Sequence, residues 1–152
     1  STDEFSQKRI LNIVDLKSRI LSIVAFKEKE NFIKIQKVIN RVSKLANNST
    51  LSKDVFSAEG YINTKLFEKD CEFRVFEFVT ELQKLFSTDH CNYLKLLNFF
   101  EINVNTIEDF FDNENGVLVM TEDINIRSNR LNLLSLIRNY SLKIADFTLL
   151  NS

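Results

Sequence analysis

The chain contains very few residues that interrupt an α-helix. Its 152 residues include no proline and two glycines. Proline removes a hydrogen bond from a helix interior and glycine weakens the helix, so their scarcity leaves long stretches free to be helical. Apolar residues also recur at steps of three and four over most of the chain, which is the spacing of one side of a helix. The sequence therefore predicts an all-α helical bundle.

We expect about five to six helices and one short extended segment. The helices are predicted over residues 4–27, 30–46, 64–86 and 88–101, near 106–112, and from a cap at Thr121 to about residue 144. Thr88 or Asp89 is placed to cap the fourth helix. Residues 47–60 are rich in Asn and Ser, which favour a loop through local hydrogen bonds, and residues 117–120 form the extended segment. The length fits a single domain over residues 1–152.

Charge is distributed unevenly along the chain, although the net charge is −1. Residues 1–53 hold 11 Lys and Arg against 5 Asp and Glu, and residues 124–152 hold 4 against 1. The middle, residues 54–123, holds 5 against 15. If the first and last helices pack side by side, their charges form one positive surface that suits a polyanion.

The second predicted helix carries a basic row. Its members, at steps of three and four, are Lys34, Lys37, Arg41 and Lys44, and they share the side opposite an apolar row that contains Phe32, Ile39 and Val42. Such a row can follow a phosphate backbone, because fixed cations release counterions when they meet RNA. The alternative is an ordinary solvated surface, which every amphipathic helix needs.

The last predicted helix has a core side and a second side with arginines. Its core side is predicted to hold Ile126, Leu133, Ile137, Tyr140 and Ile144. Arg130 falls within that row, so we expect it to be partly buried and paired, because an unpaired buried charge is costly. Arg127 and Arg138 lie to one side of the row. They are the better candidates for RNA contact, since the planar guanidinium donates in pairs and stacks on bases.

The end of the chain resembles the C-terminal end of the β subunit of bacterial glycyl-tRNA synthetase. The matching residues are Phe110, Phe111 and Asp112, Val117 to Met120, Glu122 and Asp123, Arg127, Asn129, Arg130, Leu131, Leu133 and Leu134, and finally Ala145, Asp146, Phe147, Leu149 and Leu150. Weaker matches upstream are Phe32, Asn40 to Val42, and Leu66 to Glu68 with Glu72. The connection at residues 113–116 is about three residues longer than the family pattern.

The resemblance implies an anticodon-binding domain of the DALR type, which would hold the anticodon arm of glycine tRNA. It also implies a parent enzyme that joins glycine to tRNA with ATP and Mg²⁺, in an α2β2 assembly whose α subunit holds the active site. The domain itself would need no cofactor or metal and would bind neither DNA nor a membrane. A cytoplasmic location is expected, since Cys71 and Cys91 lack metal-ligand spacing and no apolar run is long enough to span a bilayer. Because the chain begins without Met, we expect a piece of a longer protein.

Asp123 and Arg127 are the residues that we expect to read the anticodon. Glycine codons begin with two guanines, so the anticodons share two cytosines, whose edges present an amino donor beside acceptors. A carboxylate beside an arginine complements that edge, and a step of four places Asp123 and Arg127 on one side of a helix. The alternative is an ion pair that only stabilises the helix, aided by the helix dipole.

The sequence offers no constellation for catalysis. His90 is the single histidine, and neighbouring helix positions point about 100° apart, so it is poorly placed to activate Cys91. Gly60 and Gly116 stand alone and do not form a phosphate-binding loop. Two other classes stay open: a helical protein-interaction domain whose acidic middle docks a basic partner, and a thiol or metal enzyme built on His90 and Cys91.

Overall fold

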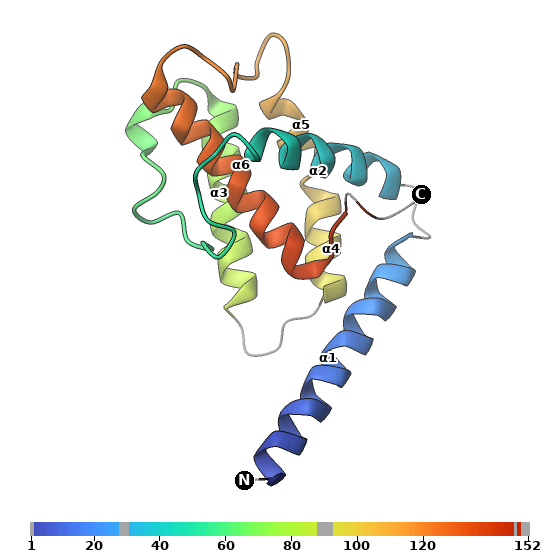
Figure 1. Ribbon diagram of the computed structural model, residues 1–152. Coiled ribbons are helices and arrows are strands. Elements are labelled where there is room, and N and C mark those ends of the chain that lie inside the picture. Colours follow the sequence, from blue (N-terminus) through green and yellow to red (C-terminus); the bar gives the residue numbers. More distant parts are fainter. Residues whose placement is uncertain (1, 28–30, 88–92, 148, 150–152) are drawn as a thin grey trace.

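The computed structural model describes residues 2–27, 31–87, 93–147 and 149 (Figure 1). Its helices are α1 (Thr2–Lys27), α2 (Phe32–Ala46), the 3₁₀ helix η1 (Thr64–Leu66), α3 (Asp70–Phe86), α4 (Tyr93–Ile102), α5 (Val104–Phe110) and α6 (Ile124–Ile144). No strand occurs in these residues, and the all-α prediction is confirmed. Within the same residues no helix is both long and apolar enough to cross a membrane.

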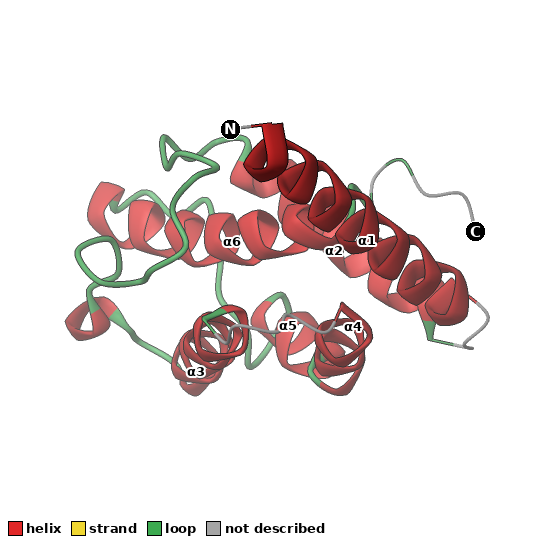
Figure 2. Ribbon diagram, turned by 90° about the horizontal axis from the view of Figure 1, so that it is seen from below, coloured by secondary structure: helices red, strands yellow, loops and turns green. Residues whose placement is uncertain are grey.

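The helices form two layers (Figure 2). α2 lies along α6 in the most extensive helix–helix contact, and α3, α5 and α4 lie on one side of that pair. α1 makes its main contact with α4 and extends away from the bundle (Figure 1). The first and last helices do not make the main contact that would pair them side by side; the basic first part of the chain instead meets α6 through α2.

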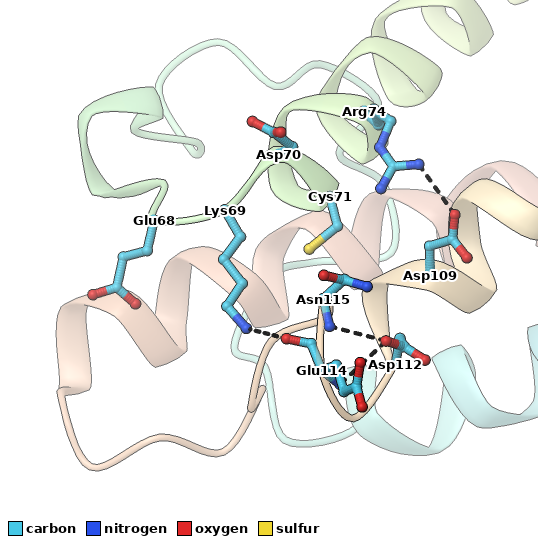
Figure 3. Close-up of a pocket in the computed structure, with 9 residues that line it drawn as sticks. All are labelled: Glu68, Lys69, Asp70, Cys71, Arg74, Asp109, Asp112, Glu114 and Asn115. Atoms are coloured by element: carbon cyan, nitrogen blue, oxygen red, sulfur yellow. Dashed lines mark hydrogen bonds and ion pairs between the residues drawn. The ribbon is translucent and has the colours of Figure 1, made fainter.

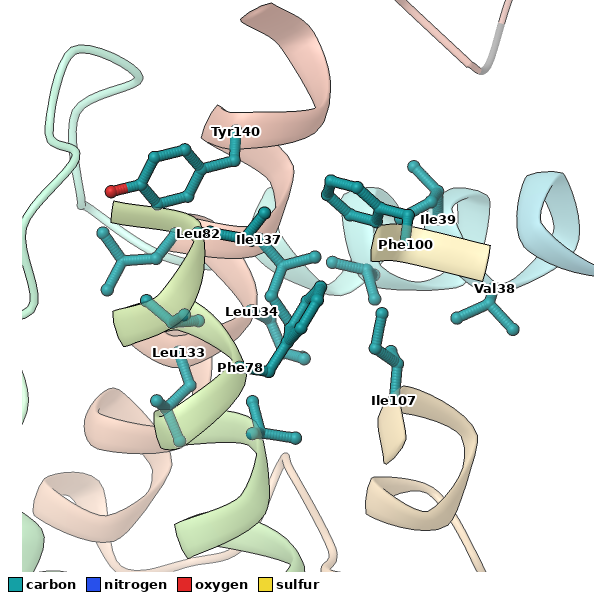
Figure 4. Packing of buried hydrophobic residues seen from close by; sticks show 14 of the residues in the cluster. Val38, Ile39, Phe78, Leu82, Phe100, Ile107, Leu133, Leu134, Ile137 and Tyr140 are labelled. Carbon is teal, nitrogen blue, oxygen red and sulfur yellow. The ribbon is translucent and has the colours of Figure 1, made fainter. Parts of the chain in front are cut away.

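The core lies between the two layers and is centred on α6 (Figure 4). The predicted apolar row of α2 is buried throughout, and four of the five predicted core residues of α6 are buried, with Ile126 half-buried near the helix start. Phe78 of α3 meets Phe99 and Phe100 of α4, each at 5.4 Å between ring centroids. Edge and offset ring contacts of this kind add to the free energy gained from apolar burial.

The helix predicted over residues 64–86 is divided into η1 and α3. Lys69 is extended, with φ −134° and ψ 155°, and the Glu72 carboxylate accepts hydrogen bonds from the amides of Glu68 and Lys69. Those amides are thereby satisfied by a side chain rather than by an earlier turn of helix. Phe67, at the break, packs edge-on against Phe73 and Phe76.

The entry to α6 differs from the prediction in two ways. Asp123, not Thr121, caps the helix, and its Oδ1 accepts from the amides of Asn125 and Ile126 at 2.9 and 3.1 Å. The segment expected to be extended is irregular at Val117 and Leu118 and forms a turn at Val119 and Met120. No neighbouring strand pairs with it in the described residues. Its position is set instead by the burial of Val119 and by hydrogen bonds to its backbone at Val117 and Leu118.

A buried ion pair joins the two layers. Arg130 of α6 donates through Nε to Glu72 of α3 at 2.9 Å, through Nη2 to Glu68 at 2.7 Å, and through Nη1 to the carbonyl of Leu118 at 2.9 Å. The Glu72 side chain is 0% exposed and that of Arg130 5%. The expectation that Arg130 is buried and paired is confirmed.

Replacing Arg130 with Met should lower the free energy of unfolding by about 3–5 kcal/mol, because it leaves the Glu72 carboxylate buried without its cation. Chemical denaturation measures this value. Arg127→Met is the matched control, since Arg127 is half-buried and donates to one backbone carbonyl, that of Thr121; its loss should cost about 0.5–1.5 kcal/mol. Equal costs for the two variants would show that the ion pair does not hold the layers together.

Candidate nucleic-acid interface

The basic row of α2 lies on one side of that helix, as predicted. Lys37, Arg41 and Lys44 are exposed, and no ion pair engages them among the described residues. Lys34 is half-buried, and its Nζ lies 3.2 Å from the Glu108 carboxylate of α5 and 2.6 Å from the Asn105 side-chain oxygen. Because Glu108 neutralises Lys34, three of the four cations remain free to meet a polyanion.

Arg41 lies over an aromatic ring at the middle of the row. Its guanidinium carbon is 4.3 Å from the centroid of the Phe111 ring, a geometry that holds the planar fork in place. Phe111 is half-buried, whereas Phe110 is fully buried in the core. Phe110 therefore belongs to the core and Phe111 lies at the surface, a difference that their adjacent positions in the sequence did not reveal.

A hollow of about 430 Å³ opens beside Arg41. One wall comes from α2, and the other is the segment that leads from α5 toward α6. The lining includes Phe111, Gly116, Leu118 and Met120, and the last two of these side chains are exposed. The hollow thus places a cation, a ring and apolar side chains together, which are the groups that hold unstacked RNA bases.

The far wall of the hollow is a tight turn over residues 112–116. The Asp112 carboxylate accepts from the amides of Glu114 and Asn115 at 3.1 and 2.9 Å, and the Gly116 amide donates to the Asp112 carbonyl. Hydrogen bonds from the backbone of Asn115, followed by that of Glu114, lower the pKa of Asp112 below its usual range. A Cβ atom on Gly116 would lie 2.4 Å from the backbone of Asp112, so the turn requires glycine.

A second hollow, of about 680 Å³, lies on the other side of Lys69 and is acidic (Figure 3). The carboxylates that line it are Glu68, Asp70, Asp109, Asp112 and Glu114. Both of its cations are engaged: Lys69 donates to the carbonyls of Glu114 and Gly116, and Arg74 pairs with Asp109 at 3.1 Å. This hollow repels phosphate, so the acidic middle of the sequence borders the basic surface and limits it.

Of the two predicted anticodon-reading residues at the start of α6, one is exposed and the other is half-buried. Asp123 is exposed, and one of its oxygens, Oδ1, accepts from both amides of the cap. Arg127 is half-buried and donates to the Thr121 carbonyl at 3.2 Å. No ion pair joins Asp123 to Arg127. Oδ2 of Asp123 and the remaining donors of Arg127 stay available.

The expectation that Arg138 lies on the surface was wrong. Its side chain is buried and donates to the carbonyls of Ala46 and Leu51 and to the Asn139 side chain. Burial lowers the pKa of its guanidinium. Because α6 is covered by α2 and by the loop after it, a position beside the core row is also enclosed, and Arg138 anchors that loop instead of facing RNA.

Cys71 lies at the acidic hollow and is not activated. Burial and the neighbouring Glu72 carboxylate raise the pKa of its thiol, which disfavours the thiolate that nucleophilic chemistry needs. His90 and Cys91, on which the alternative enzyme depends, lie outside the described residues. Within the described residues, no three His, Cys, Asp or Glu side chains are grouped so that they could hold a metal ion.

Replacing Gly116 with Ala should lower the free energy of unfolding by about 1–3 kcal/mol, because the added methyl group meets backbone atoms that cannot move aside. Thermal melting measures the loss. Gly60→Asn is the control: Gly60 has φ +81° and nothing within 4 Å of a Cβ, and Asn tolerates that backbone region. A Gly116→Ala variant that melts with the parent protein would contradict the described turn.

The chain is similar to part of several glycine–tRNA ligase β subunits. It is 33% identical over 147 residues to that of a Picosynechococcus species, covering 95% of this chain and 20% of the relative. It is 36% identical over 132 residues to that of Persephonella marina, covering 86% and 17%, and 34% identical over 140 residues to that of Dictyoglomus thermophilum, covering 90% and 19%. The chain therefore spans about a fifth of the length of these relatives. No family model and no solved structure matches it.

Proposed function

We propose that this chain is the tRNA-binding segment of a glycine–tRNA ligase β subunit and that α2 and the adjoining hollow bind the RNA. The similarity extends over 86–95% of the chain at 33–36% identity in the three relatives named above. It therefore covers the whole bundle rather than one motif. The name of those relatives supplies the activity, which is the ligation of glycine to tRNA.

One observation carries the location of the RNA. Lys37, Arg41 and Lys44 are exposed on one side of α2 without an acidic partner among the described residues, while the cations of the acidic hollow are engaged. Free cations at helical spacing attract the phosphate backbone, and the affinity that they supply is independent of sequence. The hollow beside Phe111 would take an unstacked base next to that backbone.

The finer assignment follows the resemblance of the chain's end to the anticodon-binding domain of the DALR type. The RNA element is then the anticodon arm of glycine tRNA, and Asp123 with Arg127 faces the two shared cytosines. The rest of the assembly would be an α subunit that holds the active site, in an α2β2 enzyme of the cytoplasm. ATP and Mg²⁺ would be used there, and no step is assigned to them in this chain.

A protein-interaction domain without RNA is the second candidate, and the acidic hollow favours it. Five carboxylates around a space of about 680 Å³ could accept a basic segment of another protein. The two candidates predict opposite results for the basic row, since only the first needs its cations.

Replacing Lys37, Arg41 and Lys44 together with Gln should weaken binding to all tRNAs about equally. The plot of log affinity against log salt concentration should become shallower by about 0.7–0.9 per lost phosphate contact. Filter binding with transcribed glycine tRNA at several salt concentrations measures both effects. The control carries the same loss of charge elsewhere on the exposed surface, at Lys8, Lys53 and Lys65. If both variants change the slope alike, net charge and not the row attracts RNA, and the proposed surface is incorrect.

Replacing Arg127 with Ala should cost about 1–3 kcal/mol in binding glycine tRNA, and should reduce its advantage over a tRNA altered at the two cytosines. Asp123→Asn keeps a cap acceptor, so the melting temperature should hardly change, yet its amide turns a donor toward the base and should also reduce discrimination. Ser128→Ala, at the next exposed position of α6, should alter neither property. If these variants discriminate against the altered tRNA as strongly as the parent protein does, Asp123 and Arg127 do not take part in recognition.

A further inference from the structure

Helix α1 meets the bundle through polar as well as apolar side chains. Its main contact is with α4, where the Tyr93 hydroxyl donates to the Asp15 carboxylate at 2.7 Å. Among the α1 side chains whose burial is described, the half-buried ones are Arg19, Ser22 and Ile23, and Ile23 packs against the core.

The opposite side of α1 is apolar and faces solvent. Seven large side chains there are 46–64% exposed: Ile10, Ile13, Val14, Leu16, Ile20, Leu21 and Val24. The helix projects from the bundle along most of its length (Figure 1). A continuous exposed apolar surface of this kind marks an interaction site, because leaving it in water forgoes the free energy of burial.

The centre of this surface has the spacing of a helix–helix interface. Ile10, Ile13, Lys17, Ile20 and Val24 follow one another at alternating steps of three and four residues, the heptad spacing with which one helix packs along another. We name these five positions the α1 seam. Their order indicates a single helix as the occupant, lying lengthwise along α1.

Lys17 occupies the middle position of the α1 seam and distinguishes among possible helices. Two copies of α1 paired over the whole seam, parallel or antiparallel, would place Lys17 beside Lys17. Like charges in the middle of an apolar interface disfavour that pairing, whereas a carboxylate on a different helix would satisfy the lysine and fix the register.

We infer that the α1 seam binds a helix from the remaining part of the β-subunit polypeptide, with an acidic residue opposite Lys17. The inference rests on the proposed function, since the relatives are about five times as long as their match to this chain and so contain further polypeptide. The seam then fixes the RNA-binding bundle to the rest of the subunit. A helix of another protein or a second copy of this chain would be the competing occupants.

Cysteine accessibility tests the inference. Ile13→Cys and Ile20→Cys place thiols on the seam, and Ser18→Cys, on the other side of α1 and exposed, is the matched control. Maleimide labelling is measured by peptide mass spectrometry in two settings: the 152-residue chain, and the same chain replacing the matching segment of the Picosynechococcus β subunit. The buried Cys71 must stay unlabelled, and the Persephonella marina subunit serves as a second host if the first does not fold.

In the isolated chain all three thiols should react quickly. In the full-length host subunit that carries this chain, the seam thiols should react at least about ten-fold more slowly, because labelling then requires the interface to open. The reactivity of Ser18→Cys should be unchanged. Seam thiols as reactive as Ser18→Cys in the full-length subunit would overturn the inference. Protection already present in the isolated chain, together with a dimeric mass in sedimentation, would assign the seam to a second copy and also overturn it.

Substitutions of Lys17 test the inference independently. In the full-length subunit Lys17→Glu should melt at a lower temperature than Lys17→Met, whereas in the isolated chain the two variants should melt alike. Equal melting temperatures of the two variants in both settings would show that no carboxylate lies opposite Lys17. None of these measurements involves tRNA, so loss of RNA binding with a protected seam would reject the proposed function alone.

Discussion

The arrangement of the bundle depends on the contact between Arg130 and Glu72. Neither side chain can be left alone in the interior, because a buried charge without a partner costs more than most single contacts supply. Their pairing therefore sets how α3 approaches α6, and it also holds the segment before α6, since Arg130 donates to the Leu118 carbonyl as well. The Glu72 carboxylate completes the arrangement by accepting the amides at the start of α3.

The same helix that carries Arg130 organises the long loop after α2. Side chains at three consecutive positions of α6 bond to backbone carbonyls of that region: Arg138 to Ala46 and Leu51, Asn139 to Ser52 and Val55, and Tyr140 to Phe56. Burial raises the pKa of Tyr140 to about 12, so its hydroxyl remains a donor. Polar side chains of α6 thus take the place of secondary structure in satisfying the loop.

Charge is separated across a short distance, and Lys69 lies at the boundary. It lines both hollows, but its ammonium group is held by two carbonyls. On one side lie five carboxylates, which repel a phosphate backbone, and on the other lie the free cations of α2, where we propose that RNA binds. This separation directs a polyanion to one surface even though the net charge of the chain is only −1. A folded segment attached to a larger subunit through the α1 seam could present that surface in a fixed orientation.

The sequence by itself determined the helical class, the core side of α2 and the structural role of Arg130. Helical spacing reports which side chains share a side, and an arginine inside an apolar row has few alternatives to a buried partner. Spacing does not report which neighbour covers that side. Tertiary packing decided that Arg138 is enclosed, that Phe110 is buried while Phe111 lies beneath Arg41, and that Asp123 caps α6. It also decided that seven large apolar side chains of α1 stay exposed, because burial depends on which distant elements arrive at a helix.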